Sequence, residues 1–193
     1  GLFRVELRCD GWPGGPQLLR MPVWMPGYYG LMEYPAAVQG FQALDGRGRL
    51  LPWDKPAADA WRIQTGRAVR FTIRYEVKVP APFITQSGLS EKRAYIAPPG
   101  VFLYPDGRLK LPVTVVIEPG PDWKDVATGL DPVPGKRHTF AAPDFDTLYD
   151  SPFLIGNLER LAFEVRGVHH AFYGFDLGEF DRAAFVSDLK RIV

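Results

Sequence analysis

Three histidines, His138, His169 and His170, are the residues of this chain best suited to bind a metal ion. Zinc hydrolases typically use two histidines one helical turn apart, together with a carboxylate. His169 and His170 are adjacent, however, and neighbouring residues of a strand point to opposite faces. No His-Glu-x-x-His motif occurs, and the single cysteine, Cys9, excludes an all-cysteine zinc site. The sequence therefore predicts no metal site and no cofactor in this chain.

A serine beside an acid, in Asp150-Ser151-Pro152, is the best candidate for nucleophilic chemistry. Nucleophilic catalysis needs a base on the hydroxyl, and the Gly-x-Ser-x-Gly elbow that would present such a serine is absent. We expect Asp150 and Ser151 to hydrogen-bond a loop backbone instead. Asp144 and Asp146 complete a small acidic cluster without the spacing of a calcium loop, so turn and cap roles are expected for it. No catalytic residue is predicted.

Five aromatic residues gather near the amino terminus: Trp12, Trp24, Tyr28, Tyr29 and Tyr34. In a carbohydrate-binding module such rings would form a stacking platform. They could equally plug the open end of a small β-sandwich. The prolines and glycines between them favour the second interpretation, because they indicate a rigid, packed corner.

Composition excludes several classes of protein. Of 193 residues, 46% are hydrophobic and 23% are charged, which is typical of a globular domain. The net charge of +1 comes without a basic stripe, so a nucleic-acid partner is not indicated. The apolar stretches are far shorter than the ~18 residues of a membrane span. Twenty glycines, 19 prolines and 13% aromatic residues indicate short strands joined by ordered turns.

Alternating apolar and polar residues predict the elements that would carry these side chains. Residues 69–79 alternate almost without error, and residues 2–9 do so as well, which is typical of strands with one wet face. Residues 62–65 are expected to pair with 69–79 as a hairpin across Gly66-Arg67. Further strands are predicted at 17–23, 38–44, 111–118, 137–141, 161–165 and 171–175, the last two paired with each other.

A helix is predicted only at the carboxyl end. Asp181 is a plausible N-cap, and Phe185, Leu189 and Ile192 then fall on one face. The expected fold is all-β: an antiparallel β-sandwich of curved sheets with one short C-terminal helix.

Three stretches in order resemble the amino-terminal domain of the glycyl aminopeptidase family, zinc peptidases with a thermolysin-like catalytic domain. They are Met21-Pro22-Val23-Trp24-Met25-Pro26-Gly27-Tyr28-Tyr29 with 34–38; 93–95 with 100–104; and Asp144-Phe145-Asp146-Thr147-Leu148-Tyr149-Asp150-Ser151-Pro152 with Gly156 and 163–170. Met32 stands where many relatives have an arginine, so no role of that arginine is carried over.

The resemblance implies a longer polypeptide with an accessory domain and a separate catalytic domain. Residues 1–180 would be a β-sandwich accessory domain, and 181–193 a helix leading toward a catalytic domain that this chain lacks. That downstream domain would hold the zinc and the general base, and would be the chain's main partner. The substrate would be a peptide with a free amino terminus. Relatives of this type are often exported to the periplasm or secreted, whereas the residues themselves indicate no compartment.

Two surfaces are candidates for contact with that domain or its substrate. Gln86 and Ser87 lie in Ile84-Thr85-Gln86-Ser87-Gly88, similar to a Thr-Gln loop of alanyl-type aminopeptidases that reaches the substrate's amine; an ordinary surface loop is an equal alternative. The domain interface would involve Trp24, Tyr28, Tyr29 or Asp150-Ser151-Pro152. In the isolated chain this interface should appear as an exposed apolar patch. The domain hypothesis also expects Trp24 itself to be buried and an apolar patch to lie near the carboxyl terminus. The competing hypothesis is a stand-alone β-sandwich module that binds carbohydrate or peptide through coplanar exposed rings.

Overall fold

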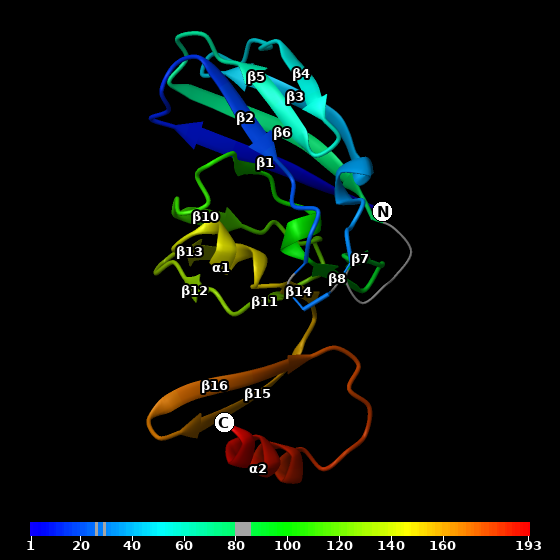
Figure 1. Cartoon of the computed structure of the whole chain (residues 1–193). Coiled ribbons are helices and arrows are strands. Elements are labelled where there is room, and N and C mark those ends of the chain that lie inside the picture. Colours follow the sequence, from blue (N-terminus) through cyan, green and yellow to red (C-terminus); the bar gives the residue numbers. More distant parts are fainter. Residues whose placement is uncertain (26, 29, 80–85) are drawn as a thin grey trace.

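The computed structural model describes residues 1–25, 27, 28, 30–79 and 86–193 of the chain. Its strands pair antiparallel throughout the described ladders, and its longest helix lies at the carboxyl end. Figure 1 shows three parts in a row: a sandwich formed by the amino-terminal strands, a second one below it, and a hairpin with a helix at the far end. The prediction of an antiparallel, mostly β fold with a short C-terminal helix is confirmed.

The first sandwich consists of two facing sheets. One has the order β1-β6-β3, with bounds Leu2–Asp10, Arg70–Lys78 and Val38–Asp45. The other has the order β4-β5-β2-β9, with bounds Trp53–Ala57, Ala60–Gln64, Pro16–Arg20 and Tyr104–Pro105. The alternation seen in the sequence places Phe71 and Ile73 of β6 inward, where they share a buried cluster with Trp61 and Ile63 of β5.

The predicted hairpin of residues 62–65 with 69–79 is wrong. β5 pairs with β2 and β4, whereas β6 pairs with β1 and β3, so the two strands belong to opposite sheets. The Gly66 carbonyl accepts a hydrogen bond from Gly15 N at 2.6 Å, so the β1–β2 and β5–β6 connections cross between the sheets side by side. Crossing lets both strands bury their apolar faces against each other, which a flat hairpin would not.

The second sandwich is smaller and includes a short helix. One sheet has the order β11-β14-β8-β7, with bounds Asp125–Ala127, Phe153–Gly156, Arg93–Ile96 and Gly88–Leu89. The other has the order β10-β13-β12, with bounds Val113–Val116, Thr139–Ala142 and Asp131–Pro132. Phe153, fully buried, lies 5.8 Å from the ring of Phe140 and 6.3 Å from that of Phe102. The short helices η2, Pro98–Gly100, and α1, Phe145–Tyr149, contact each other beside this core.

β1 joins the two sandwiches. Phe3 and Val5 pack against both buried clusters. Tyr75 of β6 donates a hydrogen bond to Val101 O at 2.8 Å and accepts one from Leu103 N at 3.2 Å. Burial raises the pKa of the Tyr75 phenol, which therefore stays neutral in this polar contact between the two cores.

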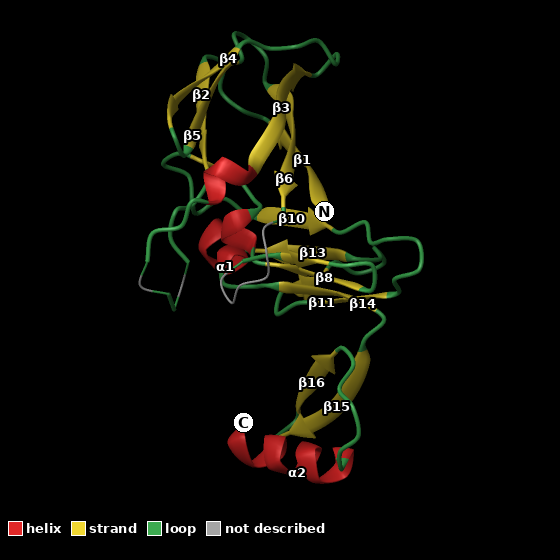
Figure 2. Ribbon diagram, turned by 90° about the vertical axis from the view of Figure 1, so that its right-hand side faces the viewer, coloured by secondary structure: helices red, strands yellow, loops and turns green. Residues whose placement is uncertain are grey.

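The third part is a hairpin and a helix. β15, Glu159–Val165, pairs with β16, Val168–Gly174, and the turn is Arg166-Gly167. Both turn residues have positive φ, 50° and 78°, as a type I′ hairpin turn requires. α2, Arg182–Ile192, packs on β15, and Figure 2 shows these three elements beyond the second sandwich. Asp181 caps α2 by accepting hydrogen bonds from Ala183 N and Ala184 N, as predicted. None of the helices in the described part of the chain has the length and apolar character needed to cross a membrane.

Candidate functional site

A loop connects β2 to the short helix η1, which spans Tyr34–Ala37. Contacts at both of its ends anchor this loop. Met32 N donates a hydrogen bond to Val23 O at 2.8 Å, which brings the two arms of the loop together. The hydroxyl of buried Tyr34 lies 3.5 Å from the sulfur of Met25. A Cβ added to Gly100 would lie 2.9 Å from the Tyr34 ring, so η1 packs tightly on η2. These contacts hold the two ends of the loop in place.

The same loop exposes large apolar side chains. Trp24 is 47% exposed and Leu31 is 81% exposed, while Tyr28 and Met32 are partly buried. The expectation that Trp24 is buried is wrong. The reason is local: Met21 is the last fully buried residue of this strand end, and the loop then leaves the sheet before Trp24 is reached. Tyr29, predicted beside it, lies outside the described residues.

The predicted aromatic set does not form one platform among its described members. Tyr34 is buried, and Trp12 packs edge-on against Phe71 at 5.8 Å, with the guanidinium of Arg108 4.9 Å from its ring. Two of the rings are thus held against the first core, as a packed corner requires. Trp24 and Tyr28 lie on the loop between β2 and η1, where Trp24 is exposed and Tyr28 is partly buried.

Gln86 and Ser87 directly precede β7. The Ser87 hydroxyl oxygen is buried and accepts a hydrogen bond from Ala97 N at 3.0 Å, so it holds the segment before η2. Gln86 is partly exposed, and its side chain makes no hydrogen bond within the described part of the chain. Residues 84 and 85, the first half of the predicted motif, lie outside the described residues. Of the pair, Gln86 is the side chain still available to a ligand.

Asp150 and Ser151 end the helix α1. The Ser151 hydroxyl donates a hydrogen bond to Thr147 O at 2.7 Å, and Asp150 is the exposed C-cap. Asp144 caps the other end by accepting from Thr147 N at 2.8 Å, which confirms a cap role in the acidic cluster. Because its hydroxyl bonds a backbone carbonyl rather than a base, Ser151 is not arranged as a nucleophile.

The histidines lie apart from one another or face different ways. His138 Nε2 lies 3.1 Å from Lys124 O, and His169 Nδ1 lies 3.4 Å from Glu164. His170 stacks on Phe163 at 5.3 Å. Across the described ranges, no three histidine, cysteine, aspartate or glutamate side chains are grouped as metal ligands. These side chains do not fit a zinc centre.

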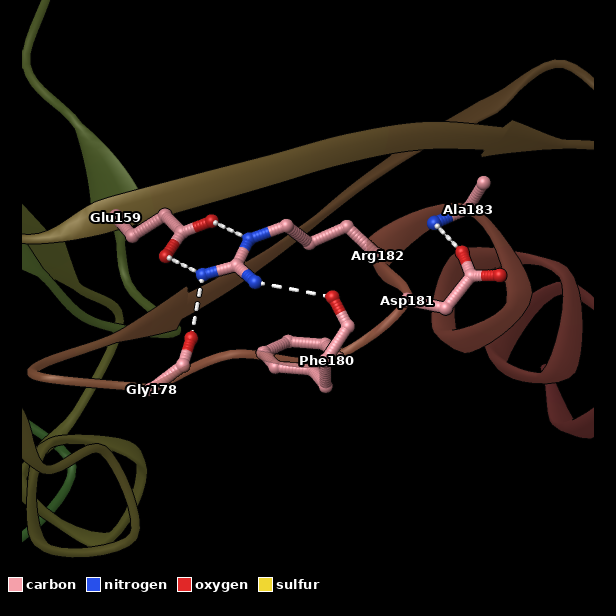
Figure 3. Close-up of polar contacts among 6 residues, drawn as sticks. All are labelled: Glu159, Gly178, Phe180, Asp181, Arg182 and Ala183. Carbon is pink, nitrogen blue, oxygen red and sulfur yellow. Dashed lines mark hydrogen bonds and ion pairs between the residues drawn. The ribbon is translucent and has the colours of Figure 1, made fainter.

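A polar cluster that sequence reasoning missed joins α2 to β15 (Figure 3). Arg182 Nε donates to Glu159 Oε1 at 2.7 Å and Arg182 Nη2 donates to Glu159 Oε2 at 2.9 Å. The same guanidinium donates to Gly178 O at 2.9 Å and Phe180 O at 3.1 Å and lies 4.3 Å from the Phe180 ring. The bond from Arg182 lowers the pKa of Glu159, and the bond to Glu159 raises the pKa of Arg182. No spacing rule links residues this far apart, so only the fold could reveal the pair.

Comparison with known proteins decides the family. A sequence model of the Peptidase M61 N-terminal domain matches residues 1–157. The chain belongs to this family. The prediction that it is the amino-terminal domain of a peptidase is thereby confirmed.

A solved structure extends the similarity of this M61 amino-terminal domain beyond residue 157. The crystal structure of an aminopeptidase N family protein from Idiomarina loihiensis superposes with a TM-score of 0.89 and 26% sequence identity, over 99% of the present chain. The match covers 33% of that protein, so the present chain spans about a third of its length. Curated proteins yield no match to the chain.

Proposed function

We propose that this M61 amino-terminal domain packs on the catalytic domain of a zinc aminopeptidase and forms one wall of its substrate cleft. The match of residues 1–157 to a peptidase amino-terminal domain carries the proposal. The likeness to a protein about three times as long supports it, since that length leaves room for a separate catalytic domain.

The zinc belongs, in this proposal, to the downstream domain. A bound zinc ion would supply an activated water that attacks the peptide bond. The histidines of this chain are engaged with Lys124 O, Glu164 and Phe163, and they do not converge. In this proposal the chain binds and orients: it offers a loop with anchored ends, and the partly exposed amide of Gln86, to a peptide with an unmodified amino terminus.

The loop between β2 and η1 is the surface best suited to the domain contact. Trp24 and Leu31 expose apolar area, while Met21 and Tyr34 fix the ends of the loop in the first core. Apolar side chains on a rigid base favour binding, because little conformational freedom is lost on contact. Large aromatic residues are also the side chains that contribute most at protein interfaces.

A matched pair of tryptophans tests the proposal. In the polypeptide extended through the next few hundred residues encoded by its gene, we expect Trp24→Ala to lower kcat/KM for an aminopeptidase substrate about tenfold or more. Trp53→Ala is the control, because Trp53 on β4 is similarly exposed, 41% against 47%, but its ring packs against that of Phe41, tilted at 60° with centroids 4.7 Å apart, in the first sandwich. Equal kinetic effects of the two substitutions would contradict a role for the loop.

The alternative is a stand-alone module that binds carbohydrate or peptide. The exposed ring of Trp24 is the observation in its favour. An oligosaccharide or peptide that shifted the tryptophan fluorescence of the wild-type chain, but not that of Trp24→Ala, would support this function over a domain contact.

A further inference from the structure

The part formed by β15, β16 and α2 lacks a core of its own. The structure describes all of residues 159–193, and the one buried residue among them, Gly174, has no side chain. Yet the part is rich in apolar residues: Leu161, Phe163, Phe172, Phe175, Phe180, Phe185, Val186 and Leu189. In both sandwiches, by contrast, the phenylalanines at the centre are fully buried, as Phe71 and Phe153 show.

Packing within this part is real but one-sided. The ring of Phe185 lies 5.0 Å from Phe172 and 5.4 Å from Phe180, and Arg182 ties the start of α2 to Glu159 (Figure 3). These contacts hold the helix on the hairpin. They cannot enclose a core, because one hairpin and one helix of fewer than about 40 residues bury too little surface to be stable alone.

The two sandwiches do not provide the missing cover. Their buried clusters contain no residue beyond Ile155. The connection is short: Leu158 N donates to Asp125 at 2.9 Å, and the guanidinium of Arg93 lies 5.1 Å from the Phe175 ring. Both Figure 1 and Figure 2 show α2 on the side of the hairpin that faces away from the sandwiches.

The open surface continues along α2. A groove of about 530 Å³ between β15 and α2 has an apolar floor that includes Leu161 and Val186 and a basic rim that includes Arg160 and Lys190. Beyond it, Ile192 is 80% exposed at the end of the helix. An apolar stripe with a charged rim is typical of a surface that a protein partner covers.

We propose that residues 159–193 are the first elements of the following domain, and that the peptidase part of the same polypeptide covers them and completes their core. Two findings support this occupant: the match to the M61 amino-terminal domain ends at residue 157, and the similar solved protein is about three times as long as the present chain, so about two thirds of it lies outside the shared region. The inference rests on the proposed function. It places the domain boundary near residue 158, not near residue 180 as the sequence suggested.

Hydrogen exchange tests the inference. In the 193-residue chain we expect the amides of β15, β16 and α2 to exchange at least tenfold faster than they do in the extended polypeptide, while the β1–β6 ladder exchanges equally slowly in both. Equal exchange of α2 in the two proteins would overturn the inference. So would protection of α2 in the 193-residue chain that appears only as sedimentation shows a dimer, because a second copy would then be the cover.

A pair of valines gives a second readout. In the extended polypeptide, Val186→Asp should lower the melting temperature of the peptidase part by 5 °C or more, whereas Val116→Asp, on an exposed face of β10, should leave it unchanged. Equal melting of the two variants would overturn the inference. Peptidase activity is measured separately: an inactive polypeptide with a protected α2 refutes the proposed function alone, and an active one with an unprotected α2 refutes the boundary alone.

Discussion

At the scale of single residues, Asp144 shows how a short helix is held in place. Its carboxylate accepts from Thr147 N at 2.8 Å and pairs with Lys110 Nζ at 3.1 Å. These bonds lower the pKa of Asp144 to about 2, and the bond from the Thr147 backbone has the largest effect. Because the unfolded carboxyl has a higher pKa, the stability that Asp144 contributes is present above about pH 4 and is lost as the pH falls toward 2.

We therefore expect Asp144→Asn to keep most of the cap but to remove this pH dependence. Asn is also a good N-cap, so melting at pH 7 should change little, whereas Asp144→Ala should lower the melting temperature by roughly 2–4 °C. Urea denaturation between pH 2 and 7 measures the difference, and NMR titration gives the pKa directly. A carboxyl midpoint near 4 would contradict the contacts described.

A prediction about substrate binding concerns Gln86. If its amide oxygen accepts a hydrogen bond from the ammonium of the substrate, Gln86→Ala in the extended polypeptide should raise KM about tenfold for peptides with a free amino terminus, because a bond to a charged group is lost. Gln42→Ala, an exposed amide on β3, is the control. An unchanged KM would refute the role.

At the scale of elements, Arg182 is the contact on which the position of α2 depends. Its guanidinium donates hydrogen bonds both to the carboxylate of Glu159 and to two backbone carbonyls of the preceding loop. In the 193-residue chain, Arg182→Ala should therefore speed proteolytic cleavage between residues 175 and 182 several-fold and reduce the helical signal. Arg191→Ala is the control, because the ion pair of Arg191 with Asp188, at 3.6 Å, lies within the same helix. Equal cleavage of both variants would show that the clamp does not hold the helix.

Strong periodicity identified elements but only some of their partners: the pairing of 161–165 with 171–175 is confirmed by β15 and β16, whereas that of 62–65 with 69–79 is not. Alternation correctly predicted β1 and β6, and a cap with spaced apolar residues predicted α2. The assignment of β5 to β6 failed because both strands are amphipathic, and alternation is the same whether two strands are neighbours or face each other across a core. The short helix α1 and strands of two residues, such as β7, contain too few residues to show any period.

The contacts and exposure of the predicted site residues also depend on tertiary structure. Motifs placed Asp150 and Ser151 in a conspicuous cluster, yet their contacts end a helix. Exposure of Trp24 depends on where the chain leaves the sheet, and the pair of Glu159 with Arg182 depends on how α2 folds back. Such facts are set by tertiary structure, so residue types and spacing alone could not supply them.

At the scale of the whole molecule, two closed cores and one open part divide the chain. Both sandwiches bury their largest side chains, whereas β15, β16 and α2 bury none. The family match covers the two closed cores and stops at residue 157, and in our proposal the open part after it belongs to the following domain. The exposed loop with Trp24 and Leu31 is a second apolar surface of the chain, before that boundary.

Peptidase activity, with added zinc, of the 193-residue chain and of the extended polypeptide tests the central claim most directly. We predict that only the extended polypeptide releases amino-terminal residues from peptides, and that a chelator abolishes this activity while leaving the melting of the 193-residue chain unchanged. Chelator-sensitive activity in the 193-residue chain would contradict the claim, as would an extended polypeptide that folds but cleaves no peptide.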